Sequence, residues 1–195
     1  MPKLGMSEIR RPQLIQATMQ VIHEVGLSNA TVAMIGRQAQ ISPSIINHYF
    51  GGKSGLLEAT MRSILKDLSH AVSERLTNIP TNQVAARIEA IVAGNFDSKQ
   101  LDPKVVKTWL AFWAQAMHDP TLARLQRVNE QRLLSHLRNE LKTVAADEEA
   151  NIMAEAIAAL IDGIWLRGAL SPKGINKQMA KAIIHDYLNS KNIRI

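Results

Sequence analysis

Residues 31–57 read TVAMIGRQAQISPSIINHYFGGKSGLL, and this stretch decides the fold class. Thr31 can cap a short helix over residues 32–39, because its side-chain oxygen can accept from an unpaired N–H group of the first turn. Ser42-Pro43 is a second start signal, a capping hydroxyl followed by proline at the first helical position. Gly51-Gly52 ends the second short helix. The spacing therefore predicts two short helices joined by a tight turn, the size of a helix-turn-helix.

The side chains of this helix pair divide into an apolar set and a polar set. Ile35, Ala39, Ile41, Ile46 and Phe50 can form a small core, which leaves Ser42, Ser44, Ile45, Asn47, His48 and Tyr49 on or near the exposed side. Short polar groups suit base edges and phosphates, and an asparagine can pair with adenine through two hydrogen bonds. Lys53 and Thr31 lie at helix starts, where free N–H groups favour a phosphate. The pattern indicates a DNA reader, although ordinary helical bundles also contain short helix pairs.

The rest of the chain is also predicted to be helical. Apolar residues recur every three or four positions, and no sustained period-two alternation marks a strand. Gly26 ends the first helix, whereas Ser54 and Asp147 cap later ones. We expect an all-α protein of about nine helices, over 8–25, 32–39, 43–50, 54–76, 82–95, 104–117, 120–143, 147–170 and 176–190.

Charge and composition narrow the function. The chain of 195 residues carries a formal net charge of +6, and residues 1–66 hold seven basic and three acidic side chains. This excess suggests a polyanionic partner, with a solvated basic face as the plain alternative. The absence of cysteine excludes disulfides and thiolate metal sites. The polar first six residues do not resemble a signal peptide, and no apolar run is long enough for a membrane span, so we expect a cytoplasmic protein.

The sequence contains no pattern typical of an enzyme. Its six histidines form no H-E-x-x-H spacing, and no Walker or dinucleotide-binding glycine motif is present. His136 and Glu140 are four residues apart and could share a metal ion, but a solvated helix face is the expected place for them. We therefore predict no catalytic residues, no metal and no cofactor.

The 31–57 stretch resembles the signature of the TetR family of repressors. The matching elements are Thr31, the turn at Gln40-Ile41-Ser42, Tyr49-Phe50, Lys53 and Leu56-Leu57. The resemblance implies an all-α homodimer that binds a palindromic operator in double-stranded DNA. It divides the chain into a DNA-binding domain over 8–68, with the helix-turn-helix at 31–50, and a ligand-binding and dimerisation domain over 69–195. The family often has glycine where this chain has Gln40, which is compatible with the turn if φ stays negative. With Arg37 and Asn47 added to the family's contacts, the predicted DNA-binding residues are Thr31, Arg37, Ser42, Ser44, Asn47, His48, Tyr49 and Lys53.

The aromatic residues after position 95 suggest a receptor for a cation. Trp109 and Trp113 are four residues apart and share a helix face, and Asp162 lies three residues before Trp165. A quaternary ammonium ion has no N–H group, so it is held by cation–π attraction and a nearby carboxylate. The alternatives are that the tryptophans form plain core and that Asp162 pairs with Arg124 or Arg127. The predicted ligand-binding residues are Phe96, Asp97, Trp109, Trp113, Asp162 and Trp165.

Segments of the same region resemble choline-responsive members of the TetR family. They are GNFD at 94–97, WLAFWA at 109–114, LARLQ at 122–126 and LIDGIWLR at 160–167. The resemblance implies a repressor of genes for choline uptake and glycine betaine synthesis, an osmoprotective pathway, with choline as inducer. The alternative is a repressor of an efflux or metabolic operon that senses another cationic or lipophilic ligand. We expect two protomers to pair through 147–170 and 176–190, where Ala154, Ala158, Gly163 and Ala169 would allow close helix approach.

Overall fold

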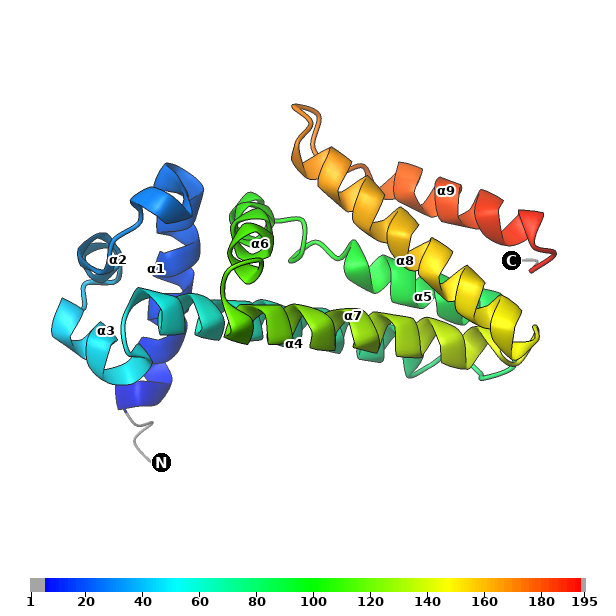
Figure 1. Cartoon of the computed structure of the whole chain (residues 1–195), viewed down its shortest axis with the longest axis horizontal. Coiled ribbons are helices and arrows are strands. Elements are labelled where there is room, and N and C mark those ends of the chain that lie inside the picture. The colour runs from blue at the N-terminus through cyan, green and yellow to red at the C-terminus, as the bar shows by residue number, and fades with distance from the viewer. Residues whose placement is uncertain (1–5, 194–195) are drawn as a thin grey trace. The chain divides into compact units, whose positions relative to one another are not determined.

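The computed structural model describes residues 6–193, which form nine helices and no strand (Figure 1). Each predicted helix is present, and most ends lie within two residues of the expected position. No helix in 6–193 combines the length and apolar character that spanning a bilayer needs. The helices are α1 (Met6–Asn29), α2 (Val32–Ala39), α3 (Pro43–Phe50), α4 (Lys53–Leu76), α5 (Val84–Asn95), α6 (Pro103–Ala116), α7 (Pro120–Leu141), α8 (Asp147–Ala169) and α9 (Lys177–Ser190).

Two predicted helix caps are wrong. Helix α4 begins at Lys53, so Ser54 lies inside its first turn. Helix α8 is preceded by Ala146 in the capping position, and Asp147 is its first helical residue. Residues 147–149, which form the start of the first turn of α8, are all acidic and complement the positive end of the helix dipole.

The first of two compact units contains α1–α3, the start of α4 up to residue 66, and residues 102–126 with α6. Helix α1 packs against both α2 and α6. Gly26 interrupts α1 with φ 75° and ψ 162°, as expected for its predicted end. Lysines bind the carbonyl oxygens near this break: Lys107 Nζ donates to the His23 oxygen at 2.7 Å, and Lys53 Nζ donates to the Leu27 oxygen at 2.6 Å. Helix α6, although distant in sequence, is therefore fastened to the first helix.

The second unit contains residues 67–101 and, of the described residues, 127–193. Helix α9 contacts both α5 and α8, and Figure 1 shows these three helices side by side. Arg87 of α5 joins three parts of this unit: its Nε donates to Glu140 Oε2 of α7 at 2.8 Å, and its Nη1 donates to the Ile79 carbonyl oxygen at 2.8 Å. Glu140 is buried, so the expectation that it lies with His136 on a solvated face is wrong. The reason is that Arg87, 53 residues earlier in the chain, supplies the charge partner.

Candidate DNA-binding and ligand-binding sites

The turn between α2 and α3 depends on two unusual backbone features. Gln40 adopts φ 56° and ψ 38°, the left-handed conformation, which corrects the expectation of a negative φ. This conformation lets the Ile41 N–H reach back to the Gly36 carbonyl oxygen at 2.8 Å and close the end of α2. Gly36 itself is closely covered, since a Cβ there would lie 2.6 Å from the Ile41 carbonyl oxygen. A side chain at position 36 would therefore clash with the backbone of the turn.

Gln40→Gly should stabilise the protein. Glycine enters the left-handed region without the Cβ clash of glutamine, so we expect a gain of about 1 kcal/mol in the free energy of unfolding. For a chain of this length, the gain corresponds to a rise in Tm of roughly 2–4 °C. Thermal denaturation followed by circular dichroism measures it. Gln38→Gly, at a right-handed helical position in the last turn of α2, is the matched control and should lower Tm, whereas a lower Tm for Gln40→Gly would contradict the explanation of the turn.

Helix α3 presents a polar face and buries an apolar one. Ile46 and Phe50 are buried in the first unit, whereas Ser44, Asn47 and His48 are exposed and Tyr49 is half-buried. The Tyr49 ring packs edge-on against His48, with ring centroids 5.2 Å apart. Arg11 of α1 stacks over the Phe50 ring at 5.1 Å and holds the end of α3. The result is a short helix with an apolar buried face and exposed polar side chains on the other side.

The helix starts around α3 are capped differently from one another. Thr31 Oγ1 accepts from the Met34 N–H at 3.2 Å, as predicted, and its hydroxyl can still donate. Ser42 occupies the capping position of α3 but makes no capping bond, because its Oγ lies 2.9 Å from Ser44 Oγ instead. The Lys53 ammonium binds the end of α1 through one of its three donors, so two remain for a phosphate. Arg37 is exposed in the last turn of α2.

The predicted ligand residues fall in both units. In the first unit, Trp109 and Trp113 lie with ring centroids 5.7 Å apart and planes tilted by 48°, and Phe112 meets Trp109 edge-on. Trp109 is buried, whereas Trp113 is half-buried and donates from Nε1 to Gln126 Oε1 at 3.2 Å. The two indoles touch each other, so they share one aromatic surface and do not enclose a slot.

Four predicted ligand residues belong to the second unit, where Phe96 and Trp165 are buried. The Asp97 carboxylate is already balanced, because Arg75 Nη2 lies 2.5 Å from its Oδ2 and the Lys99 N–H donates to its Oδ1. Burial by itself would raise the pKa of Asp97, but the bonds from Lys99 and Arg75 hold that pKa below its usual value.

Asp162 has a different environment from Asp97. Its side chain reaches solvent, yet the protein packed around its carboxyl, and secondarily the Glu130 carboxylate, raise its pKa to about 6. Among the described residues, this carboxyl forms no hydrogen bond and no ion pair. The alternative that Asp162 pairs with Arg127 is therefore wrong. A carboxylate with a raised pKa and a like-charged neighbour is a place where a cation would bind favourably.

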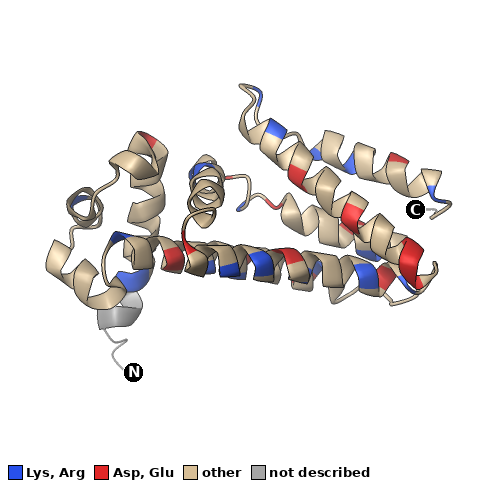
Figure 2. Ribbon diagram, in the orientation of Figure 1, with Lys and Arg blue, Asp and Glu red and all other residues tan. Residues whose placement is uncertain are grey.

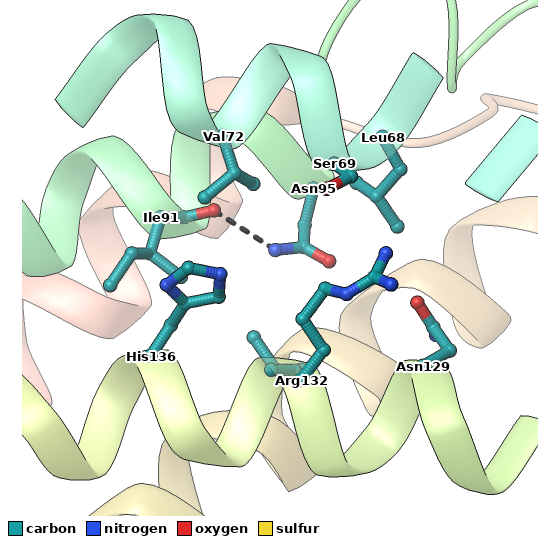
Figure 3. Close-up of a pocket in the computed structure, with 9 residues that line it drawn as sticks. Leu68, Ser69, Val72, Ile91, Asn95, Asn129, Arg132 and His136 are labelled. Carbon is teal, nitrogen blue, oxygen red and sulfur yellow. Dashed lines mark hydrogen bonds between the residues drawn. The ribbon is translucent and has the colours of Figure 1, made fainter. Parts of the chain in front are cut away.

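The second unit contains a cavity of about 20 Å³ that is lined by residues of α4, α5 and α7, which Figure 3 draws. Asn95 donates to the Ile91 carbonyl oxygen at 2.9 Å, and its side-chain oxygen points toward the Arg132 guanidinium (Figure 3). Burial, and then the Arg132 charge, lower the pKa of His136, so its ring is neutral at pH 7. The lining contains no carboxylate and has room only for a water-sized group. This cavity does not suit a quaternary ammonium ion.

An all-helical chain that exposes the second helix of a helix-turn-helix belongs, as a class, to the DNA-binding transcriptional regulators. Two family models match: residues 14–60 match the bacterial regulatory proteins of the tetR family, and residues 84–191 match the BetI-type transcriptional repressor C-terminal domain. The HTH-type transcriptional regulator BetI of Vibrio vulnificus is 58% identical over 98% of this chain and 96% of its own length. BetI 2 of Chromohalobacter salexigens is 52% identical over 97% and 91%. The chain therefore belongs to the TetR family, as a BetI-type transcriptional repressor, and not to an enzyme family.

Solved structures confirm the fold. A putative transcriptional regulator from Pseudomonas aeruginosa superposes with a TM-score of 0.83 at 24% identity, covering 94% of this chain and 90% of that one. A putative transcriptional regulator from Saccharomonospora viridis, in complex with choline, superposes with a TM-score of 0.77 at 19% identity, covering 92% and 95%. At these identities the likeness establishes the shared all-helical architecture.

Proposed function

We propose that this protein represses genes for choline uptake and for the oxidation of choline to glycine betaine, and that choline releases it from its operator. The observation that carries this proposal is the 58% identity to a BetI regulator over nearly the whole chain. The segments that resemble choline-responsive regulators, and the choline bound to a protein of similar fold, support it further. Such a repressor acts in the cytoplasm, where bacterial DNA lies.

The DNA contacts that we propose are the eight predicted residues on and around α3. Exposure of Ser44, Asn47 and His48 on one helix face supports base and phosphate contacts from α3. Lys53 would add a positive charge at the start of α4, next to unpaired N–H groups. Both contributions depend on how α2 and α3 are held together, to which the close turn at Gly36 contributes.

Substitutions in this face should weaken operator binding in two distinguishable ways. Asn47→Ala should reduce affinity for an operator obtained by in vitro selection by about 1–3 kcal/mol and relax specificity at one base pair. Lys53→Met should weaken binding to all sequences and reduce the salt dependence by about one charge. Fluorescence anisotropy at several salt concentrations measures both, with Lys66→Met as the control lysine on α4. Unchanged affinity in both Asn47→Ala and Lys53→Met would contradict the assigned face.

We further propose a homodimer that pairs through the outward faces of α8 and α9. Ile152, Ala159 and Leu166 recur every seven residues along α8 and are exposed, and Met179 is exposed on α9. A seven-residue apolar repeat is typical of a helix seam. Ala154 and Ala158, expected in this seam, instead face the chain's own core, whereas a Cβ added at Gly163 would meet no described atom within 4 Å beyond its own helix. A two-fold pair would place two α3 helices on one palindrome.

Asp162 is the carboxylate that we propose for the ligand's counter-charge. Asp97 already has Arg75, whereas Asp162 faces Glu130 and has no described cationic partner. Figure 2 shows further acidic positions along α8, of which Asp147 and Glu155 are paired with Lys142 and Arg138. We propose that Trp165, which belongs to the same unit as Asp162, supplies aromatic surface. Helix α4 starts in the first unit and ends in the second, so we expect it to transmit the ligand's effect.

Choline should bind more weakly at low pH, in a manner that depends on Asp162. With a pKa of about 6, this carboxyl is ionised at pH 7.5 and largely protonated at pH 5, so the affinity should fall by about tenfold over that range. Tryptophan fluorescence and operator release measure binding and induction. Asp162→Asn should bind weakly at both pH values, whereas the control Glu148→Gln should behave as the unmodified protein.

Two results would contradict the choline proposal. One is that choline changes neither tryptophan fluorescence nor operator binding. The other is that the uncharged analogue of choline, in which a tert-butyl group replaces trimethylammonium, binds equally well. If a bulkier cation releases the operator and choline does not, the inducer is another member of the cationic class.

A further inference from the structure

The second unit contains a cavity of about 320 Å³ between α5 and α9. We propose that it binds a small amphipathic anion, such as a medium-chain carboxylate, as a second input separate from the quaternary ammonium ligand proposed above. The residues that line it are Glu89, Val92, Ala93, Phe96, Lys177, Gln178, Lys181, Ile184 and His185.

The cavity has the size and the floor of a small-ligand pocket. Its volume lies at the lower end of the range of roughly 300–1,000 Å³ that is common for such pockets. Val92, Phe96 and Ile184 form an apolar floor of buried side chains, and Ala93 leaves space because it is small. Removing an alkyl chain from water against this floor would be favourable, with a gain of about 0.8 kcal/mol per buried CH₂ group.

The charges at the mouth favour an anionic head group. The Lys181 ammonium lies 3.4 Å from Glu89 Oε2, so these two charges balance. Asp97 is balanced in the same way by Arg75 at 2.5 Å. The remaining charged group at the mouth is the Lys177 ammonium. It is not ion-paired with Asp97, but its charge lowers the pKa of the Asp97 carboxyl. The mouth therefore has an excess of one positive charge.

The start of α9 adds to this positive potential. Lys177 is the first residue of α9, and Asn176 caps the helix by accepting the Met179 N–H at 2.9 Å. The N–H groups of Lys177 and Gln178, in the same first turn, have no helical acceptor. A carboxylate at this position would meet a lysine, free N–H groups and the positive end of the helix dipole together.

These charges separate the cavity from the proposed choline site. The sequence predicts that Phe96 offers its ring to a quaternary ammonium ion, but it lies in the floor of a cavity whose mouth is positive. The surface proposed for dimerisation also lies elsewhere on α9. Met179 follows Lys177 by two residues, which places it about 200° around the helix. A partner that packs on Met179 would leave the cavity open.

Isothermal titration calorimetry with three probes tests the proposal on the full-length protein. Octanoate should bind at one site per protomer, whereas 1-octanol, which has a tail of the same length and no charge, should bind at least tenfold more weakly. Acetate, which lacks the tail, should show no measurable binding. Equal binding of the two eight-carbon probes would overturn the proposal.

Two variants locate the site. Lys177→Glu should weaken octanoate binding at least tenfold, whereas Lys173→Glu, an exposed lysine in the preceding turn, should leave it unchanged. Ala93→Trp should fill the cavity and abolish binding, with circular dichroism as the check on folding. Unaltered octanoate affinity in Lys177→Glu would overturn the proposal even if Ala93→Trp fails to fold. Choline titrations of Lys177→Glu keep the two proposals apart, since a lost choline response with octanoate binding intact would count against the choline proposal alone.

Discussion

Arg87→Met should be the most destabilising of the substitutions considered, with a loss of about 3 kcal/mol in the free energy of unfolding. The Arg87 side chain is 15% exposed and that of Glu140 is 11% exposed. Removal of the guanidinium would leave a nearly buried carboxylate without its counter-charge. It would also remove the donor to the Ile79 carbonyl oxygen, just after the end of α4. The hydrogen bond to Glu140 raises the pKa of Arg87, which indicates that the pair is ionised together in the native state.

A double variant distinguishes a lost ion pair from lost packing. In Arg87→Met/Glu140→Leu no charge remains buried, so we expect most of the stability to return. The return should be incomplete, because the Ile79 carbonyl oxygen still lacks its donor. Chemical denaturation of the two single variants and the double variant measures the coupling. If the double variant is less stable than both single variants, the destabilisation comes from lost packing and the explanation is wrong.

Ile152→Glu combined with Leu166→Glu should convert a dimer into monomers and weaken operator binding at least about a hundredfold. The two side chains are 61% and 41% exposed and lie two heptads apart on α8. Two charges in the proposed seam would have to be buried without partners, which is unfavourable. Separation of the protomers removes the second DNA contact, and linked binding contributes a factor of about 10²–10⁴.

Sedimentation velocity measures the oligomeric state, and titration with operator DNA measures the affinity. Val144→Glu is the matched control, because Val144 is 54% exposed but lies in the turn before α8. It should leave both the oligomeric state and the affinity unchanged. If the unmodified chain sediments as a monomer at micromolar concentration, or if the double variant remains a dimer, the proposed seam is wrong.

The helix-turn-helix was accessible from sequence because its determinants are local. The Thr31 cap, Pro43 in the first turn of α3 and the glycine after Phe50 all act within a few residues. The apolar spacing of Ile46 and Phe50 then decides which face of α3 is buried. The left-handed conformation of Gln40 could not be predicted from the sequence, because glutamine has no special preference for positive φ. Closure of the turn on Gly36 imposes it.

The charge partners in the second unit could not be predicted, because they join residues far apart in the chain. Asp97 meets Arg75 across 22 positions, and Glu140 meets Arg87 across 53. The sequence offered Arg124 or Arg127 as a partner for Asp162, but the charge that acts on its carboxyl is that of Glu130 on α7. The cavity between α5 and α9 is of the same kind, since its residues come from helices about 80 positions apart.

The sequence by itself determined that this protein is all-helical, where most of its helices begin and end to within about two residues, and which short helix pair is suited to DNA. These properties follow from caps, turns and apolar periodicity, which act over a few residues. Only the tertiary structure decided which carboxylates are already neutralised, that Gln40 is left-handed, and that the mouth of the α5–α9 cavity is positive. Charge balance and cavity shape depend on which distant side chains come together, and this is settled by packing of the whole chain.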